Sequence, residues 1–536
     1  MTTRGYRVAV LSAFVSVCAL PLVGVSDDAG AIIARHKAFM GWFYGDGTLK
    51  SVRETIAIVA ATPKPDATPP PTPKPGATPP AYGQRAEHTM ILRRELLYRS
   101  TETGYDRALG EGGFTGNLFW RANENGFTVT VRGPGAAMEL TNDIIEAEAF
   151  GDVPNALRSS TTFDEKKALV VRITPNQGVA ADLFFAEDGA LLGYTLDPDD
   201  ATERETVHYV SYDEFAPHKR YVNAFRYGDS RRVYRVTEFQ ANAPVSDADL
   251  HPPVPHATWT FGEPHTIPIT IRRGSRYGAA VVFEATINGH VGKFLFDSGS
   301  GGVLLTNHFA RLAGLQEIGR SAFGGVNGGT VGATTVKLST IAVGGNTLHD
   351  VIGLEAPPLV GGEREDTTMD GIIGFDMLAT ALVDVDLATE KLTILDPKEN
   401  QPVVKAGAYA FPLDLSEFHA GVPLKLQNDV LPSVWLDTGN SFFVILPHAM
   451  QERHVGTVTD HALFGGVDGV GQYPADCVRF NVIQIGPYRY EHALSCFAPN
   501  EAFGKSGGLI GFDFLKHFNW TFDYSRGQLV LTPNGQ

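Results

Sequence analysis

Apolar residues of this chain occur mostly in short runs or in alternation with polar residues, which is typical of β-strands. Phe127–Val131 alternates, and Ala168–Ile173 is an apolar run with the length of a buried strand. Leu183–Phe185 and Leu191–Tyr194 flank Asp188-Gly189, a dipeptide that favours a tight hairpin turn. Further strands are expected at Val207–Tyr212, Tyr221–Tyr227 and Arg232–Phe239. The pattern predicts a mainly β protein.

Helical spacing is found near the start of the chain, at Ile32–Trp42. With the strands that follow, it predicts a β-rich α+β domain over residues 30–250. Residues 62–80 interrupt this domain with two nearly identical proline-rich copies. Because proline lacks the amide donor that a sheet needs, we expect an extended, solvated spacer there rather than a recognition segment. The proline-rich stretch Pro244–Pro255 predicts the end of the domain.

Two matching stretches stand out in the rest of the chain. Phe294–Ser300 reads Phe-Leu-Phe-Asp-Ser-Gly-Ser, and Val434–Asn440 reads Val-Trp-Leu-Asp-Thr-Gly-Asn. Each apolar run ends in Asp-(Ser/Thr)-Gly, so Asp297 and Asp437 are expected at the edge of a core, beside a sharp turn. The two aspartates lie about 140 residues apart (437 − 297).

The surroundings of the two aspartates also repeat. Three markers follow each of them in the same order, namely a Phe-Gly-Gly-Val segment (323–326 and 464–467), an apolar Gly-containing strand (371–378 and 508–515) and a hairpin-like pair of runs (382–395 and 520–531). Matching order at matching offsets indicates an internal repeat.

This tandem resembles the aspartic proteases, most closely the bacterial retropepsin-like type with two lobes in one chain. The resemblance covers roughly Pro255 to Pro533. It implies a bilobal fold of two six-stranded-type β-barrel lobes, at residues 255–398 and 399–536. It also implies peptide or protein substrates and neither a metal nor a cofactor. Because one chain supplies both aspartates, a monomer is expected to suffice.

The family's site residues transfer onto the matching positions. The catalytic pair falls on Asp297 and Asp437, and Asn440 stands where the family usually has Ser or Thr. Residues that would support the two catalytic loops are Ser298, Gly299, Thr438 and Gly439. Residues that would form mobile flaps over the substrate are Phe323, Gly324, Gly325, Val326, Phe464, Gly465, Gly466 and Val467. Neither segment carries the tyrosine of pepsin's flap, which the viral relatives also lack.

Peptide hydrolysis by this route needs a base that activates water and an acid that protonates the leaving side. Two carboxyls that share one proton supply both. At a separation of ~4 Å and an effective dielectric constant of ~20, two carboxylates repel by about 4 kcal/mol, or roughly three pK units. One is therefore charged and the other neutral over a mildly acidic range, as the aspartic-protease dyad illustrates.

The N-terminal region resembles LolA/LppX-type curved sheets of bacterial envelopes, in the order of its elements and the cadence of its hairpins. The resemblance implies three alternative roles, which are to hold an apolar ligand, to position substrate or to cover the protease lobes. It also defines a rival function for the whole chain, a catalytically inactive envelope binding or carrier protein for peptides or apolar ligands.

Composition and the N-terminus suggest an exported protein. The net charge of −16 argues against nucleic acid and anionic membrane surfaces as partners. Residues 1–29 have the form of a secretory signal, with Arg4 and Arg7 before the apolar Val8–Val25, and Ala29-Gly30-Ala31 is one option for cleavage. We expect a periplasmic or secreted protein without a stable transmembrane span, and the alternative is an uncleaved anchor. No later apolar run is long enough to span a membrane.

Two cysteines, Cys477 and Cys496, remain outside the signal segment. They flank a strand-like run and the turn Gly486-Pro487, so a hairpin could bring them together. In an exported chain an even count permits a disulfide, and two buried thiols are the alternative.

Overall fold

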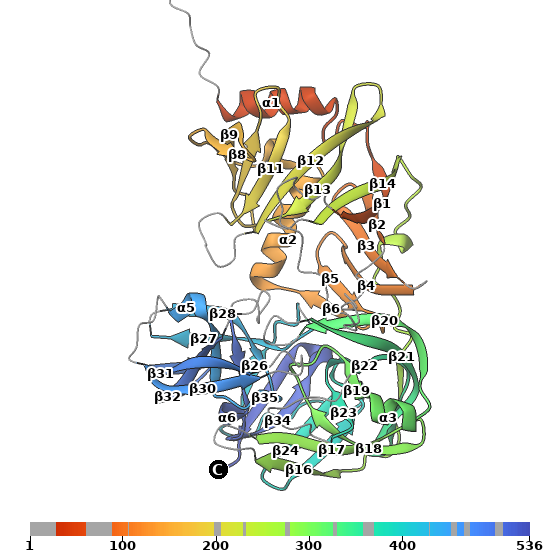
Figure 1. Cartoon of the computed structure of the whole chain (residues 1–536), viewed down its shortest axis with the longest axis vertical. Coiled ribbons are helices and arrows are strands. Elements are labelled where there is room, and N and C mark those ends of the chain that lie inside the picture. Colours follow the sequence, from red (N-terminus) through yellow and green to blue (C-terminus); the bar gives the residue numbers. More distant parts are fainter. Residues whose placement is uncertain are drawn as a thin grey trace, which may run out of the picture.

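The computed structural model describes residues 28–60, 88–104, 107–197, 205–228, 232–273, 279–324, 330–356, 369–416, 418–427, 429–451, 458–465, 472–498 and 507–535. The prediction of a mainly β protein is confirmed, since three sheets make up most of this chain (Figure 1). The proline-rich insert 62–80 and nearly all of the expected signal segment lie outside the described residues. Among the helices that the structure describes, none is long and apolar enough to cross a membrane.

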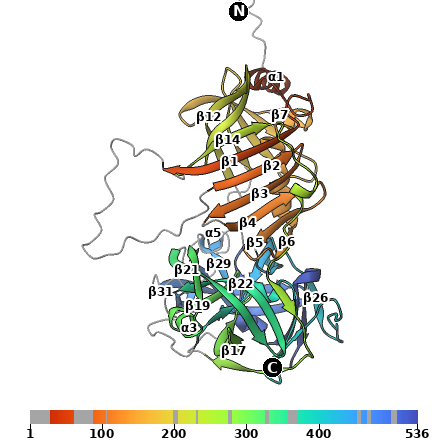
Figure 2. The ribbon, with the colours of Figure 1, turned by 90° about the vertical axis from the view of Figure 1, so that its right-hand side faces the viewer.

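A single antiparallel sheet dominates the N-terminal half, in the order β6-β5-β4-β3-β2-β1-β14-β13-β12-β11-β10-β9-β7, with β8 paired to β9. Its strands are β1 (Ser51–Ala60), β2 (His88–Arg94), β3 (Leu97–Gly104), β4 (Arg107–Phe114), β5 (Phe119–Asn123), β6 (Thr128–Val131), β7 (Asn155–Leu157), β8 (Thr161–Phe163), β9 (Lys166–Ile173), β10 (Ala181–Phe185), β11 (Leu191–Leu196), β12 (Glu205–Ala216), β13 (Lys219–Tyr227) and β14 (Arg232–Ala241). Figure 2 shows these strands as a ladder that ends, at β5 and β6, against the C-terminal half.

Two helices pack on this sheet. Helix α1 (Ala29–Met40) begins at the N-cap Asp28, so cleavage at Ala29–Ala31 would cut its first turn. It overlaps the predicted helical segment, but it starts three residues earlier and ends two residues earlier. Helix α2 (Gly133–Glu146) was not predicted, because its Gly-Pro-Gly start reads as a chain break, although proline is well accommodated in a first helical turn.

The first repeat contributes most of the second sheet and two short helices. Its elements are β15 (Thr258–Thr260), β16 (Ile267–Arg273), β17 (Ala279–Ile287), β18 (His290–Phe296), β19 (Val303–Thr306), α3 (Asn307–Leu312), β20 (Gln316–Gly324), β21 (Thr330–Val343), β22 (Asn346–Ala356), β23 (Gly371–Ile373), α4 (Phe375–Leu378), β24 (Leu382–Asp386) and β25 (Lys391–Leu395). An additional pairing of β17 with β21 closes this part of the sheet on itself.

The second repeat has the same order of elements. They are β26 (Tyr409–Pro412), β27 (Gly421–Leu426), β28 (Asp429–Leu436), β29 (Val444–Pro447), α5 (His448–Gln451), β30 (Val458–Gly465), β31 (Gln472–Ile485), β32 (Tyr488–Ala498), β33 (Leu509–Ile510), α6 (Phe512–Leu515), β34 (Phe518–Asp523) and β35 (Gln528–Pro533). Here β27 pairs additionally with β31, as β17 pairs with β21 in the first repeat.

The closing hairpins of the two repeats share one sheet, because β24 pairs antiparallel with β34. Beneath it lies a continuous apolar core that takes side chains from both repeats, including Phe296, Val383 and Trp520. In the second repeat Cys477 and Cys496 face each other on β31 and β32 and form a disulfide.

The β5–β6 hairpin fixes the N-terminal sheet to the first repeat. Phe127 and Val129 of this hairpin are buried in the core that the repeats share. Asn125 at its turn pairs with the backbone of Ile352 on β22, donating to the carbonyl oxygen at 3.0 Å and accepting from the N–H at 2.7 Å. The N-terminal half therefore meets the repeats through a packed contact.

Candidate active site

Each Asp-(Ser/Thr)-Gly loop is set by the same three-strand arrangement. In the first repeat β23 runs parallel to β18 and antiparallel to β19, so it lies between the strand that leads into the Asp297 loop and the strand that leaves it. In the second repeat β33 has the same position between β28 and β29. The N–H of Asp297 donates to the carbonyl oxygen of Ile373 at 3.2 Å, and the N–H of Asp437 donates to the carbonyl oxygen of Ile510 at 2.9 Å.

The glycine after each short central strand has a packing role. A Cβ at Gly374 would lie 2.4 Å from the carbonyl oxygens of both Asp297 and Ser300. A Cβ at Gly511 would lie 2.3 Å from the carbonyl oxygen of Phe442. Real Cβ atoms do not approach backbone this closely, so the Ile-Ile-Gly and Leu-Ile-Gly motifs allow the loops to pack against the strands.

The two loops are joined by reciprocal hydrogen bonds between Ser298 and Thr438. The Ser298 N–H donates to Thr438 Oγ1 at 2.9 Å, and the Thr438 N–H donates to Ser298 Oγ at 3.1 Å. Each hydroxyl also donates to a backbone carbonyl oxygen of the other loop. Ser298 donates to Leu436 at 2.7 Å, and Thr438 donates to Phe296 at 2.9 Å. Both side chains are fully buried, so these bonds are shielded from water.

The loops bring the carboxyls of Asp297 and Asp437 together, and the two side chains share a hydrogen bond. Each carboxyl lies against the glycine of the opposite loop. A Cβ at Gly299 would be 2.5 Å from the Asp437 carboxyl, and one at Gly439 would be 2.7 Å from the Asp297 carboxyl. The glycines therefore permit the close approach of the two acids.

Backbone amides orient both carboxyls. Gly299 N–H donates to Asp297 Oδ1 at 2.8 Å, and Gly439 N–H donates to Asp437 Oδ1 at 2.9 Å. Asn440 N–H donates to the same Asp437 oxygen at 3.0 Å. Since a backbone N–H makes this bond, Asn440 in place of the family's Ser or Thr leaves it intact.

Burial raises the pKa of both acids. For Asp297 the effect of burial is opposed by the Gly299 N–H and by the charge of His419. For Asp437 burial acts together with the charge of Asp297, and its pKa lies well above the usual value. The pair is therefore set to keep a proton at a pH where an isolated aspartic acid is ionised.

His419 was not predicted. It lies in the loop before β27, and its Nε2 is 3.0 Å from the carbonyl oxygen of Gly299 in the opposite catalytic loop. Its ring stacks on Trp435, with centroids 4.2 Å apart. No motif in the sequence marks this histidine, and only the pairing of the repeats brings it to the site.

The expected flaps are partly described. Strands β20 and β21 form one hairpin, with Phe323 opposite Val331, and β30 and β31 form the other, with Phe464 opposite Tyr473. Gly324 and Gly465 end the first strand of each hairpin. The predicted tip residues Gly325, Val326, Gly466 and Val467 lie outside the described residues.

The part of the chain that the structure describes holds no group of three or more His, Cys, Asp or Glu side chains suited to a metal ion.

Comparison with known proteins gives a family match over part of the chain. No curated protein matches the chain. Residues 283–377, which run from β17 through the Asp297 loop to α4, match the aspartyl protease family.

Proposed function

We propose that this chain is an aspartic endopeptidase whose catalytic dyad is Asp297 and Asp437. The observation that carries the proposal is the hydrogen-bonded contact of the two carboxyls, braced by Ser298 and Thr438. The aspartyl protease match covers the loop of Asp297. Because the second repeat matches the first, we infer that residues 399–536 form the second lobe and that Asp437 is the second acid.

In the proposed mechanism the two carboxyls hold a water molecule between them. The ionised carboxyl takes a proton from this water as its oxygen bonds to the scissile carbonyl carbon. The protonated carboxyl donates to the carbonyl oxygen, which gives a neutral tetrahedral diol. The C–N bond then breaks as the nitrogen takes the proton that came from water. A hydroxyl of the diol returns its proton to the other carboxyl as the carbonyl re-forms, which gives a carboxylic acid and restores the dyad.

The surroundings of the dyad suit this chemistry. Burial favours one shared proton, and buried N–H donors and the Ser298–Thr438 bonds fix the carboxyls before substrate arrives. The hairpins β20–β21 and β30–β31 supply the two strand pairs from which flaps would extend over a peptide. One chain supplies both acids, so we propose an active monomer.

The proposed cellular setting follows from the N-terminus. We propose export by the signal at residues 1–29, with the N-terminal domain at 30–250 as a separate module before the two lobes.

A binding or carrier protein is the second candidate, and the hollow in the N-terminal half favours it. The test is cleavage of a mixed peptide library between about pH 3 and pH 7 by wild type, Asp297→Asn and Asp437→Asn. Each preparation is checked for folding by circular dichroism and gel filtration.

We expect cleavage by wild type and a loss of at least about 1000-fold in each variant, since neither acid can act alone. Asp513→Asn is the control, because Asp513 lies in the same repeat as Asp437, in α6, and bonds only to Lys516 among the contacts described for it. Absence of cleavage by folded wild type would favour the carrier function. Cleavage that persists in both variants would exclude the dyad.

A further inference from the structure

A hollow of about 130 Å³, partly open to solvent, lies inside the N-terminal half. Strands β1, β2, β13 and β14 form its floor, and the end of α2 borders it. Its lining is mostly apolar and aromatic, and it includes Met40, Trp42, Ile56, Tyr221, Phe225 and Phe239. Its lining is typical of sites for small organic molecules.

A second hollow of about 510 Å³ adjoins the first, and Arg93 and Glu146 line both. It extends along β3, β4 and β5 and reaches Phe418 of the second repeat. Tyr98, Trp120 and Tyr234 are among its aromatic residues. The two together give a long space that is mostly apolar and aromatic in the first hollow and mixed in the second, where Glu102, Arg121 and Glu139 also line it.

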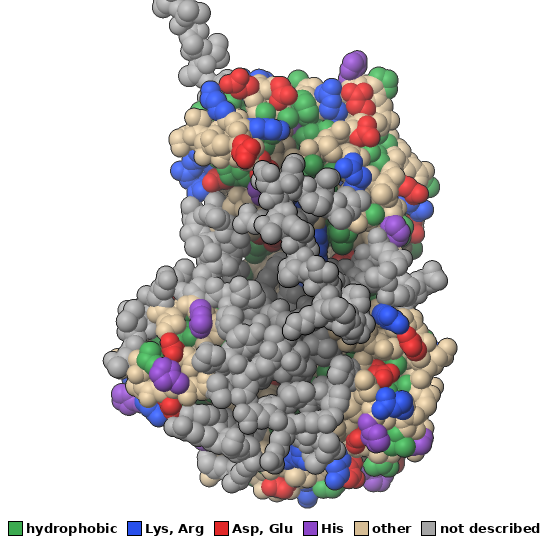
Figure 3. Space-filling view, viewed as in Figure 1, with side chains coloured by type: hydrophobic (Ala, Val, Ile, Leu, Met, Phe, Trp, Pro, Cys, Tyr) green, Lys and Arg blue, Asp and Glu red, His purple; other side chains and the backbone are tan. Residues whose placement is uncertain are grey.

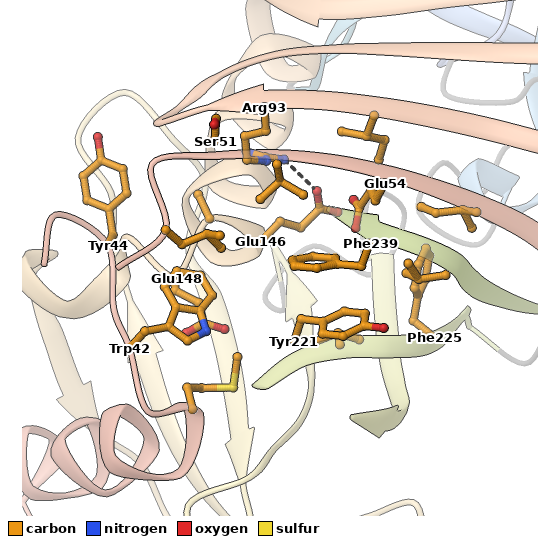
Figure 4. A pocket seen from close by; sticks show the side chains of 18 of the residues that line it. Trp42, Tyr44, Ser51, Glu54, Arg93, Glu146, Glu148, Tyr221, Phe225 and Phe239 are labelled. Atoms are coloured by element: carbon orange, nitrogen blue, oxygen red, sulfur yellow. Dashed lines mark hydrogen bonds and ion pairs between the residues drawn. The ribbon is translucent and has the colours of Figure 1, made fainter. Parts of the chain in front are cut away.

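The polar groups at the junction are unbalanced in charge. Arg93 is the one guanidinium among three carboxyls, those of Glu54, Asp143 and Glu146. Arg93 pairs with Asp143, and its guanidinium nitrogen Nη2 lies 3.2 Å from the carboxylate oxygen Oε2 of Glu146. Figure 4 shows Arg93, Glu146 and Glu54 close together, with the rings of Phe239 and Tyr221 on the other side of the hollow.

One of these carboxyls keeps an unpaired oxygen. Asp143 is only 2% exposed, and its Oδ2 has no hydrogen-bond partner. A buried carboxylate oxygen without a donor costs free energy unless a ligand or a proton supplies one. Burial also raises the pKa of Glu54 to about 7. By contrast, acidic and basic side chains are interspersed on the face of this half that Figure 3 shows.

We propose that this cavity binds an organic cation with an apolar or aromatic body, its ammonium or guanidinium group held by the carboxylates around Arg93. The cation would donate to Asp143 and Glu54, and the body would lie along the aromatic lining, where cation–π contacts add to the attraction. An anion would meet an excess of carboxylates, and a neutral apolar molecule would leave the Asp143 oxygen unpaired. This proposal does not depend on the proteolytic function.

The test uses three probes of equal shape, phenylbutylamine, phenylbutanol and phenylbutyrate, titrated calorimetrically into the full chain at neutral pH. We expect the amine to bind at least about tenfold more tightly than the alcohol, and the carboxylate to bind most weakly. Equal or tighter binding of the carboxylate, or no binding of any probe, would overturn the proposal.

Variants locate the bound amine. Glu54→Gln removes one carboxylate that takes no part in the Arg93–Asp143 pair, so the fold is expected to survive. It should weaken amine binding about tenfold and leave alcohol binding unchanged. Glu187→Gln is the control, because Glu187 lies on the same domain with its side chain 77% exposed.

Asp297→Asn separates this cavity from the dyad, which is also acidic. Amine affinity should be the same in this variant as in wild type. Affinity that Glu54→Gln leaves unchanged, or that Asp297→Asn abolishes, would contradict binding in the N-terminal cavity.

Discussion

Asn125 donates a hydrogen bond from Nδ2 to Asp376 Oδ1 at 3.0 Å, and so links the N-terminal half to the helix that follows the Gly374 turn. Asn123 donates to the same oxygen at 2.8 Å. Asp376 is 1% exposed, and burial raises its pKa to about 7 despite these donors. The junction therefore contains a carboxyl that retains its proton in the folded protein.

This carboxyl should make stability depend on pH. Between the unfolded value of 3.8 and about 7, the folded state binds a proton that the unfolded state does not. The contribution to stability is therefore complete below 3.8 and is lost as pH rises to about 7. From pH 5 to pH 8 we expect Asp376 to contribute a loss of about 3 kcal/mol in the free energy of unfolding, measured by denaturant titration, in addition to the loss from Glu54, whose pKa burial also raises to about 7.

Asp376→Asn should remove the part of this loss that Asp376 contributes, because the amide does not titrate. Asp513→Asn, at the equivalent position of the second repeat, should leave it unchanged, since the Asp513 side chain is 48% exposed. An equal pH dependence in wild type and Asp376→Asn would show that another group is responsible.

Sequence reasoning located the two aspartates because their signal is local. An apolar strand, the Asp-(Ser/Thr)-Gly turn and the later Ile-Ile-Gly strand lie in fixed order, and a repeat makes the order recognisable. The Asp376–Asn125 contact could not be predicted in this way. It joins residues 251 positions apart, and its asparagines belong to an ordinary hairpin turn.

The catalytic glycines should be more sensitive than their neighbours. Gly299→Ala and Gly439→Ala would place a methyl group 2.5 Å and 2.7 Å from the opposite carboxyl. The carboxyls would have to separate, and we expect kcat/KM to fall by at least about 100-fold. Peptide cleavage by each purified variant measures this.

Gly301 provides the matched control, since a Cβ there meets nothing within 4 Å. Gly301→Ala should keep wild-type activity within about twofold. Comparable losses in all three alanine variants would mean that loop flexibility, and not the close approach of the acids, is what the glycines provide.

Titration of the dyad should limit activity on both sides of an acidic optimum. Because the pKa of Asp437 is raised by burial and by Asp297, the shared proton should be lost only above the usual range of an aspartic acid. The charge of His419 lowers the pKa of Asp297. His419→Gln should therefore raise that pKa and move the acidic limb of the kcat/KM profile to higher pH.

Glutamine retains an amide donor for the Gly299 carbonyl, so a purely structural role of His419 would lower kcat/KM at every pH without moving the limb. Such a uniform loss would contradict the electrostatic role. Asp437→Asn, which abolishes the shared proton, should show no measurable pH profile of kcat/KM.

Local pattern also explains which elements were missed. Helix α2 begins with Gly-Pro-Gly and carries Asp143 and Glu146 toward the sheet, so neither its start nor its polar face reads as a buried helix. Its position is set by Arg93 on β2, a contact 50 residues distant. His419 likewise gains its role only when two repeats pair, since the loop around it lacks a counterpart motif in the first repeat.

The hydroxyl of Thr438 should contribute more to stability than its size suggests. It donates to the Phe296 carbonyl oxygen and accepts from the Ser298 N–H, both at 2.9 Å in a fully buried site. Thr438→Val keeps the shape but leaves both backbone groups unpaired, at about 1–3 kcal/mol each. We expect a loss of about 2–6 kcal/mol in the free energy of unfolding, together with reduced cleavage.

Thr438→Ser is the control, because it retains the hydroxyl and removes only a methyl group, which should cost about 1 kcal/mol. Ser298→Ala breaks the same bracing from the other loop, and a double-mutant cycle of Ser298→Ala with Thr438→Val measures how strongly the two loops are coupled. Because the two hydroxyls join the same pair of loops, the combined loss should be smaller than the sum of the single losses. Additive losses would mean that each hydroxyl stabilises only its own loop, and the reciprocal bonds would then not account for the fixed distance between Asp297 and Asp437.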